Sequence, residues 1–248
     1  MSNTLAFQQY TLMDFEGGCE AAFEALKGLG IDTVEPWCGA VPDDPDASMS
    51  MEGMREALSK AGMKLTCGHL TAAEYDARYE EWRDLLLDFG SKDWVIPFAK
   101  ADTLEEWLEL LPKFREMADR MKQDGLSLGY HNHNMELVKM GDKYVMEHLL
   151  DNMPDLNAQF HIGQFRPERG IDLSDWIKKY QGRVCSLHVN DSNADGATRL
   201  GEGTCKAEEA IRTSVDTGVD TFILEIRLTN ETLDGVKRDV AFVRKLIG

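Results

Sequence analysis

The chain has 248 residues, of which 43% are hydrophobic and 29% charged, a balance typical of a folded globular protein and not of a disordered or membrane chain. Its 44 acidic and 27 basic residues give a formal net charge of −17, and because no cluster of Lys and Arg offsets this charge, we expect no binding to nucleic acid. No apolar run reaches the length of a transmembrane helix, and the N-terminus lacks the basic start and apolar block of a signal peptide. We therefore expect a cytoplasmic protein without a membrane partner.

Eight short runs with the composition of β-strands follow one another along the chain. They occupy residues 5–12, 31–37, 64–70, 93–99, 126–133, 156–163, 183–191 and 221–227. Segments with helical periodicity lie between several of these runs, at 18–30, 51–62, 104–125, 172–183 and 232–248, and Pro112 predicts a kink or a break in the third. The alternation predicts a single (β/α)8 TIM barrel that spans residues 1–248. A doubly wound open sheet is the alternative, and the lack of a GxGxxG or GxxxxGK[ST] motif after the first strand disfavours it.

Polar side chains collect at the carboxyl ends of the predicted strands, where the active sites of TIM barrels lie. They are Glu35, His69, His131, His133, His161, His188 and Glu225. Five of the six histidines belong to this set, and only His148, in a helix-like segment, does not. For Glu35 and His69, contact with a substrate and local hydrogen bonding are equally open.

The four last strands each offer one side chain that can bind a metal ion: His131, His161, His188 and Glu225. Imidazole and carboxylate ligands suit Zn²⁺, Mn²⁺, Co²⁺ or Fe²⁺ better than Ca²⁺ or Mg²⁺. In the fifth strand, His131 and His133 share one face, whereas Tyr130 and Asn132 point the other way. One of these two histidines can bind metal while the other contacts substrate or transfers a proton, and a supporting hydrogen bond is the alternative for His133.

Several motifs, in the order GYHNHNMEL, FHIG, RVCSLHVND, LGEG and FILEI, together resemble the xylose-isomerase-like barrels of the sugar phosphate isomerase/epimerase type, in the branch that contains YHNH. The resemblance covers most of the chain and implies a TIM barrel with a divalent metal ion at its mouth, usually held by Glu, Asp, His and Glu. His188 and Glu225 match the last two of these ligands. His131 stands where many relatives have the glutamate, His161 where aspartate is common, and Asn190 where lysine is frequent.

The resemblance implies a metal-dependent isomerase or epimerase that acts on a sugar or keto-sugar by proton abstraction next to a metal-bound carbonyl. In epimerase members two metal-bound glutamates exchange the proton. Only Glu225 is present here, so His131 or His133 would replace its partner. The missing carboxylate keeps open a lyase or hydratase of the 3-keto-glycoside eliminase type, and a sugar-binding barrel without turnover is a third alternative. Association into a homo-oligomer is an expectation at the level of the family.

The remaining candidates for contact with a sugar substrate are polar side chains near strand ends: Asn132, Asn190, Arg166 and Arg199. For the two arginines a salt bridge on the surface is the alternative. Three aromatic residues near strand ends, Trp37, Trp94 and Phe165, would stack on a sugar or serve in packing. Glu136 lies five residues beyond His131 and has no assigned role.

Overall fold

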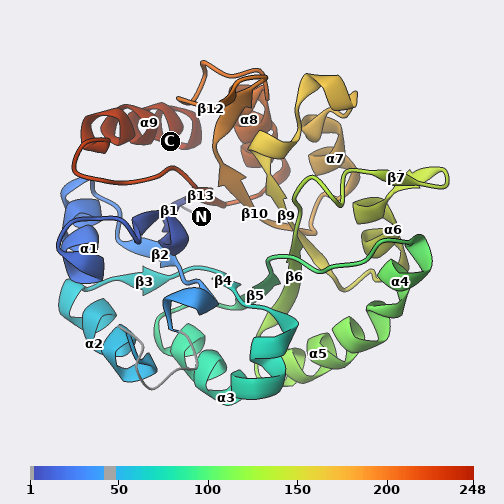
Figure 1. Ribbon diagram of the computed structural model, residues 1–248, viewed down its shortest axis with the longest axis horizontal. Coiled ribbons are helices and arrows are strands. Elements are labelled where there is room, and N and C mark those ends of the chain that lie inside the picture. Colours follow the sequence, from blue (N-terminus) through green and yellow to red (C-terminus); the bar gives the residue numbers. More distant parts are fainter. Residues whose placement is uncertain (1–2, 42–48) are drawn as a thin grey trace.

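Parallel strands form a ring in the computed structural model, which describes residues 3–41 and 49–248 (Figure 1). The strands are hydrogen-bonded in the order β3-β2-β1-β13-β10-β9-β6-β5-β4. Their bounds are β1 (Thr4–Gln8), β2 (Thr33–Glu35), β3 (Lys64–Leu65), β4 (Gly68–His69), β5 (Asp93–Ile96), β6 (Ser127–His131), β9 (Asn157–His161), β10 (Val184–Val189) and β13 (Thr221–Leu224).

The two ends of this strand order meet because β3 and β4 are parts of one interrupted strand. Leu65 on β3 pairs with Val34 on β2, and β4 continues beside β5 after two intervening residues. The N–H of His69 donates to the carbonyl of Pro36 (2.8 Å), and Trp37 pairs with His69. The nine short strands therefore make an eight-stranded barrel, and the predicted (β/α)8 fold is confirmed.

Helices cover the outside of the barrel (Figure 1). They are α1 (Gly18–Gly28), α2 (Met51–Ala61), α3 (Ala72–Asp88), α4 (Leu104–Glu109), α5 (Leu111–Gln123), α6 (Val145–Asn152), α7 (Leu173–Lys179), α8 (Ala207–Thr217) and α9 (Leu233–Ile247). Two antiparallel hairpins extend from the loops, β7 (Lys139–Met140) with β8 (Lys143–Tyr144), and β11 (Asp191–Asn193) with β12 (Gly196–Thr198). None of the helices in the described residues is long and apolar enough to cross a membrane.

The helices add two points to the sequence-based prediction: one predicted helix is two, and two helices were not predicted. The predicted helix is interrupted at Leu110 into α4 and α5, with Pro112 in the first turn of α5, which confirms a break and not a kink. No helix was predicted for 72–88 or 207–217. The buried side of α3 consists mainly of aromatic residues, and that of α8 of small ones such as Ala207 and Ala210, so neither has a stripe of aliphatic residues.

Alternation along β6 directs side chains to the two sides of the barrel wall. Tyr130 is fully buried against the helices, with its ring 5.9 Å from that of Phe114 and 6.5 Å from that of Trp107. Its neighbour His131 points into the barrel, where it contacts Gln159. Burial of a large side chain such as Tyr130 contributes about 1.5–3 kcal/mol to folding, which makes a shift of this strand by one residue costly.

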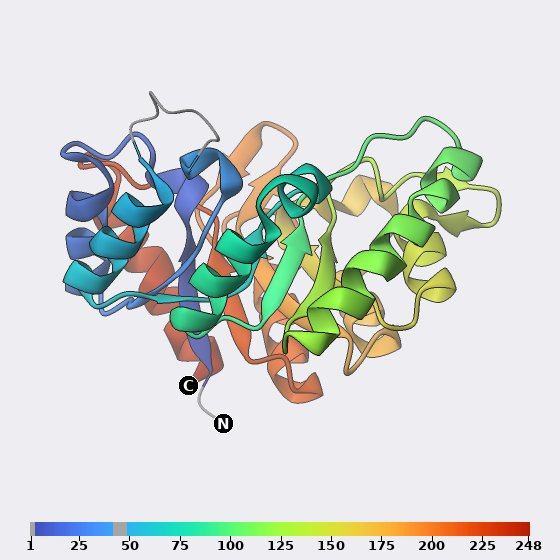
Figure 2. The same ribbon diagram turned by 90° about the horizontal axis from the view of Figure 1, so that it is seen from below.

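The interior of the barrel changes from apolar to polar along the strands. Ala6, Cys67, Val95 and Ile223 form a small apolar cluster inside the ring. Two residues further along their strands, Ala6 is followed by Gln8, Cys67 by His69 and Ile223 by Glu225. The polar end is the carboxyl end of the strands, and the first residue of β1 and the last turn of α9 lie toward the opposite end (Figure 2).

Candidate functional site

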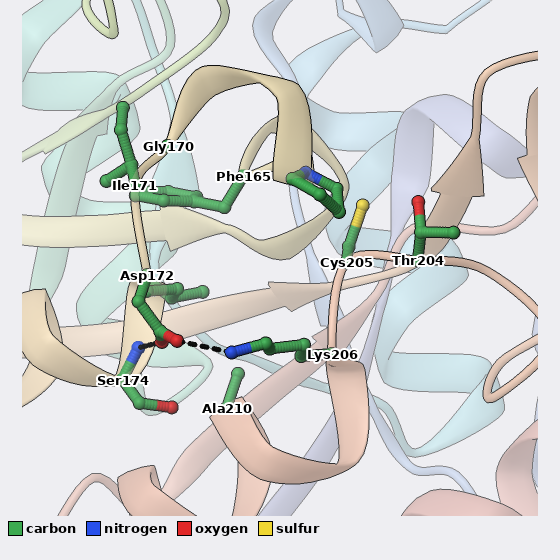
Figure 3. Close-up of a pocket in the computed structure, with 11 residues that line it drawn as sticks. Phe165, Gly170, Ile171, Asp172, Ser174, Thr204, Cys205, Lys206 and Ala210 are labelled. Carbon is green, nitrogen blue, oxygen red and sulfur yellow. Dashed lines mark hydrogen bonds and ion pairs between the residues drawn. The ribbon is translucent and has the colours of Figure 1, made fainter.

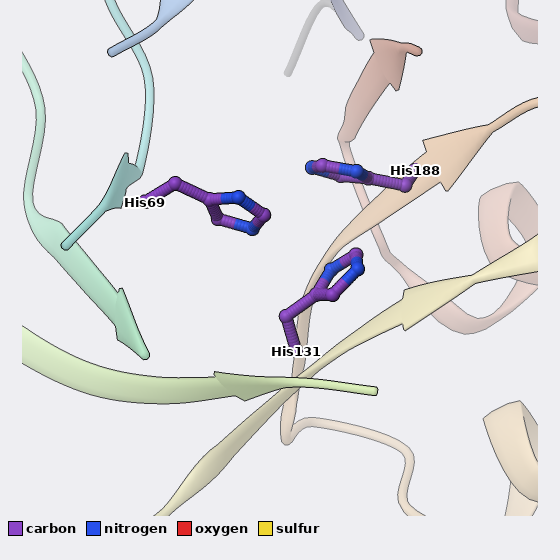
Figure 4. Close-up of side chains that lie close together, drawn as sticks. All are labelled: His69, His131 and His188. Atoms are coloured by element: carbon purple, nitrogen blue, oxygen red, sulfur yellow. The ribbon is translucent and has the colours of Figure 1, made fainter. Parts of the chain in front are cut away.

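The predicted strand-end side chains converge inside the mouth of the barrel. Glu35 closes β2, His131 closes β6, His161 closes β9, and Glu225 directly follows β13. Figure 4 shows His69, His131 and His188 turned toward one another from β4, β6 and β10. The rings of His131 and His188 lie 4.4 Å apart, and those of His69 and His188 stack at 4.8 Å.

Glu35 is a fully buried carboxylate at the base of this cluster. It accepts hydrogen bonds from the amides of Gln8 and Gln159 (2.7 Å for the latter), from the thiol of Cys67 (3.1 Å) and from Nε2 of His188 (2.6 Å). Burial raises the pKa of Glu35, but His188 and His69 outweigh burial and hold this pKa below its ordinary value. Glu35 is therefore an ionised group that supports His188 from within the barrel.

His188 lies between two carboxylates. Its Nε2 faces Glu35, and its Nδ1 is 3.3 Å from Oε2 of Glu225. Burial lowers the pKa of His188, but Glu35 and Glu225 together raise this pKa to about 10. In the absence of another cation, His188 is thus an imidazolium ion that pairs with both carboxylates.

His161 lies beside Glu225, whose side chain is 20% exposed. Nε2 of His161 is 3.3 Å from Oε2 of Glu225 and 2.6 Å from Nδ2 of Asn190. Burial lowers the pKa of His161 to about 4 despite the nearby Glu225. Burial raises the pKa of Glu225, but His161 and His188 outweigh it and bring this pKa well below its ordinary value.

Three groups of side chains in the described residues have ligand atoms close enough to hold one metal ion. They are His161, His188 and Glu225; His69, His131 and His188; and His131, His133 and His161, each with its atoms within 4.8 Å of one another. The four predicted ligands therefore do not form one cluster. His131 lies behind His161, with its Nε2 3.1 Å from Nδ1 of His161.

Gln159 is a site residue that the sequence analysis did not identify. It is fully buried on β9, and its Oε1 contacts Nε2 of His69 (2.6 Å) and Nδ1 of His131 (2.8 Å). Its Nε2 donates to Glu35 and to Oγ of Ser186 (2.8 Å). The alternation of side chains along the strand could have identified it, because Gln159 shares the inward face with His161 two residues later.

The loop after β6 holds His133 at the edge of the mouth. Glu136 is fully buried and accepts hydrogen bonds from the backbone N–H of His133 (2.8 Å) and the hydroxyl of Tyr130 (2.8 Å). Asn132 is also fully buried, and its Oδ1 accepts the backbone N–H of His161 (3.1 Å). Nδ1 of His133 is buried and has no hydrogen-bond partner among the described residues. Glu136 thus fixes the loop, and His133 retains a nitrogen for another partner.

The predicted arginines lie outside the histidine cluster. Arg199 pairs with Asp239 on α9 (2.8 Å), and this carboxylate is only 1% exposed. For Arg199 the structure thus has the salt bridge that the sequence analysis gave as the alternative to substrate contact, although the acidic partner Asp239 is buried and not on the surface. Arg166 follows β9 by five residues and makes no hydrogen bond to the histidines within the described part of the chain.

The predicted aromatic residues separate into packing and rim positions. Trp94 and Phe165 are buried, and the indole N–H of Trp94 donates to the carbonyl of Leu70 (2.8 Å). Trp37 is half-buried and packs edge-on against Tyr10, with the ring centroids 5.0 Å apart. Of the three, Trp37 is the most exposed.

A cavity of about 270 Å³ lies beside the mouth, between the segment from Phe165 to Ser174 and the start of α8 (Figure 3). Lys206 and Asp172 form an ion pair at its wall (2.6 Å). None of the site histidines lines this cavity. The cavity is therefore separate from the candidate metal centre.

The strand order defines the protein as a TIM barrel, and the side chains at the strand ends form a candidate metal centre at its mouth. No protein-family model and no curated protein sequence matches the chain. Among solved structures, it is similar to a sugar phosphate isomerase/epimerase from Parabacteroides distasonis, with a TM-score of 0.79 and 16% identity over 98% of this chain and 96% of the other.

Two further structures share the fold. One is the probable 3-DHS dehydratase AsbF from Bacillus anthracis, with a TM-score of 0.75 and 14% identity over 97% of this chain and 98% of the other. The second is a xylose isomerase-like TIM barrel protein from Mycobacterium smegmatis in complex with magnesium, with a TM-score of 0.73 and 14% identity over 100% of this chain and 97% of the other. The chain thus has the fold of the xylose isomerase-like TIM barrels, as the sequence motifs predict.

Proposed function

We propose that the protein is an isomerase or epimerase that depends on a divalent metal ion and acts on a sugar or keto-sugar. The observation that carries this proposal is the convergence of Nε2 of His161, Nδ1 of His188 and Oε2 of Glu225 at the carboxyl end of the barrel. Two imidazoles and one carboxylate fit Mn²⁺, Zn²⁺, Co²⁺ or Fe²⁺. A magnesium ion, as in the M. smegmatis protein, prefers oxygen ligands.

The residues behind these ligands support the same assignment. Glu35 accepts the Nε2–H of His188, which leaves Nδ1 as the metal-binding nitrogen and increases its basicity. In this arrangement Asn190 occupies the lone pair of His161, so its amide would have to turn away on metal binding. When bound, the ion would supply Lewis acidity that stabilises negative charge next to a substrate carbonyl.

Two groups of the chain are placed for proton transfer. All polar contacts of the Glu225 carboxylate with described residues use Oε2, which leaves Oε1 to accept a proton from a substrate carbon. His133 is half-buried at the rim, and its imidazole ring would return or relay the proton. His131, behind His161, is the alternative second group.

A lyase or dehydratase is the second candidate, and the count of carboxylates favours it. Glu35 and Glu136 are fully buried with their oxygens occupied by hydrogen bonds. Within residues 3–41 and 49–248, Glu225 is therefore the sole carboxylate of the cluster open to the mouth, whereas exchange between two carboxylates needs a second. A single base with an imidazole acid suits removal of a proton and departure of a leaving group.

Metal analysis tests the centre. We expect about one equivalent of metal after expression with Mn²⁺ or Zn²⁺, and a loss on His161→Ala or His188→Ala of at least about tenfold in metal affinity. His148→Ala is the matched control, because His148 donates to the carbonyl of Met140 outside the mouth. Retention of metal by both site variants would exclude this centre.

Solvent exchange tests the reaction. In D₂O the wild-type protein should introduce deuterium next to the carbonyl of one or more ketoses, and Glu225→Gln should abolish the exchange. Mass analysis of the products then separates the two candidates, because an isomerase conserves the formula of the sugar and a dehydratase releases water. Failure to exchange with any ketose in a broad panel would contradict both.

A further inference from the structure

We infer that Gln159 is a positioning residue, whose amide determines which ring nitrogen of His131 carries hydrogen. Through His131 it leaves without hydrogen the ring nitrogen of His161 that faces Glu225. This inference deepens the proposed function and rests on it for the identity of the metal ligands. The orientation of the amide itself depends only on contacts inside the barrel.

The contacts of Gln159 leave one orientation for its amide. Glu35 already accepts hydrogen bonds from Gln8, Cys67 and His188, so it acts as an acceptor. The amide atom 2.7 Å from Oε1 of Glu35 must therefore be the NH₂ group, because an amide oxygen there would face another acceptor. The oxygen of Gln159 then points to the histidines.

This oxygen fixes the hydrogens on two imidazoles. Nε2 of His69 and Nδ1 of His131 lie 2.6 Å and 2.8 Å from it, and both must donate, since an amide oxygen only accepts. Nδ1 of His69 is then the acceptor for the amide of Gln8 at 3.2 Å, which agrees with this assignment.

The assignment continues from His131 to His161. With hydrogen on Nδ1, the Nε2 atom of neutral His131 is an acceptor, and the atom that faces it at 3.1 Å is Nδ1 of His161. His161 must donate from Nδ1 and so keeps the lone pair on Nε2, 3.3 Å from Oε2 of Glu225.

Asn190 leads to the same result from the opposite side. Its Oδ1 accepts the backbone N–H of Gly163 (2.8 Å), so its NH₂ group is the atom 2.6 Å from Nε2 of His161. An NH₂ group requires an acceptor, and Nε2 of His161 is again without hydrogen. Two chains of hydrogen bonds that share no residue except His161 thus agree.

The role of Gln159 is to make one of two arrangements stable. Without its oxygen, His131 can carry hydrogen on Nε2 and donate to His161. If the amide of Asn190 also turns away, His161 would then hold hydrogen on the nitrogen that faces Glu225. A metal ion cannot bind that nitrogen without displacing its proton. The loss of such a supporting hydrogen bond typically reduces metal affinity by about 10- to 100-fold.

The first test is nitrogen NMR of the histidine rings in metal-free wild-type protein at neutral pH. We expect hydrogen on Nδ1 of both His131 and His161, and on Nε2 of His69. Assignment uses single His→Asn substitutions at other histidines. Hydrogen on Nε2 of His131 or His161 in the wild-type protein would overturn the inference, and this result needs no variant of Gln159.

The second test compares three variants. Gln159→Glu keeps an acceptor oxygen for both histidines, with a protonated carboxyl group in place of the amide, and should preserve the tautomers. Gln159→Met removes the acceptor and should yield a mixed population of His131 tautomers and a loss of Zn²⁺ or Mn²⁺ affinity of about 10-fold or more. Ser186→Ala removes a different contact of the Gln159 amide and should change neither.

Equal populations of the His131 tautomers in Gln159→Met and wild type would overturn the inference, even if the variant has a lower free energy of unfolding than the wild type. If Gln159→Met does not fold, the wild-type spectra and the Gln159→Glu spectra decide. Failure of the proposed function would look different: the tautomers would follow the expectation, but the wild-type protein would bind no metal and exchange no proton.

Discussion

The buried pair of Glu35 and His188 leads to a sharp prediction about stability. Substitution Glu35→Gln keeps the shape and one acceptor oxygen but removes the negative charge 2.6 Å from Nε2 of His188. The pKa of His188 is raised from 6.5 to about 10, and this corresponds to at most about 5 kcal/mol of stability for the metal-free protein. Because Glu225 remains beside Nδ1, we expect Glu35→Gln to lower the free energy of unfolding by about 3 kcal/mol at pH 6.5.

The pH dependence follows from the signs of both pKa shifts. The folded-state pKa of His188 lies above its unfolded value, so its contribution is complete below pH 6.5 and disappears as the pH rises through 10. The pKa of Glu35 is lowered from 4.5, so its contribution is present above pH 4.5 and is lost in more acidic solution. The difference between wild type and variant should therefore be largest near pH 5–6.5 and shrink toward pH 10.

Glu136→Gln is the matched control. Glu136 is equally buried, but its partners are the neutral donors Tyr130 O–H and His133 N–H. We expect a loss of about 1–3 kcal/mol that does not change between pH 6.5 and 10. The assay is urea unfolding in EDTA at several pH values. Equal, pH-independent losses in the two variants would refute an ion pair between Glu35 and His188.

Three further changes test other parts of the structure. Arg199→Ala leaves the buried Asp239 without its partner, so we expect a loss of about 3 kcal/mol in urea unfolding with an unchanged KM; a raised KM at unchanged stability would instead make Arg199 a substrate anchor. Because the pKa of His161 is lowered from 6.5 to about 4, metal-free protein should lose up to about 3 kcal/mol as the pH falls from 6.5 to 4, and an NMR titration midpoint near 6.5 for this ring would contradict that expectation. Gly203→Ala would place a Cβ atom 2.1 Å from Oδ1 of Asp191, whose carboxylate accepts the N–H of Gly203 itself, so we expect a loss of about 1–3 kcal/mol in thermal unfolding, and an unchanged Tm would disprove the close contact.

The sequence predicts the barrel and the location of the histidines because both depend on local patterns. Alternation along a strand and the shared carboxyl end of parallel strands suffice to bring His131, His161 and His188 together. Which ring nitrogen faces which partner depends on side chains from other strands, such as Gln159 and Glu35. An uncharged amide such as that of Gln159 belongs to no recognisable motif, so its hydrogen-bond partners become visible only in three dimensions.

Other differences arise from contacts between distant segments. Arg199 is directed away from the mouth by Asp239, which lies 40 residues later on α9. Glu136 is close to His131 in sequence, but the loop returns toward the strand. The carboxylate of Glu136 therefore accepts hydrogen bonds from Tyr130 and His133. Neither outcome follows from residue type or spacing.

The interrupted strand formed by β3 and β4 has a consequence for how this protein can acquire new activities. His69 lies where the barrel closes, and it contacts Gln8 and Gln159 from strands elsewhere in the ring. Exchange of His69 for another residue would therefore change the histidine cluster and remove side-chain contacts to two other strands at once. His133 and Asn190 sit in loops beyond the strands, so a laboratory evolution experiment should find its tolerated and informative changes there first.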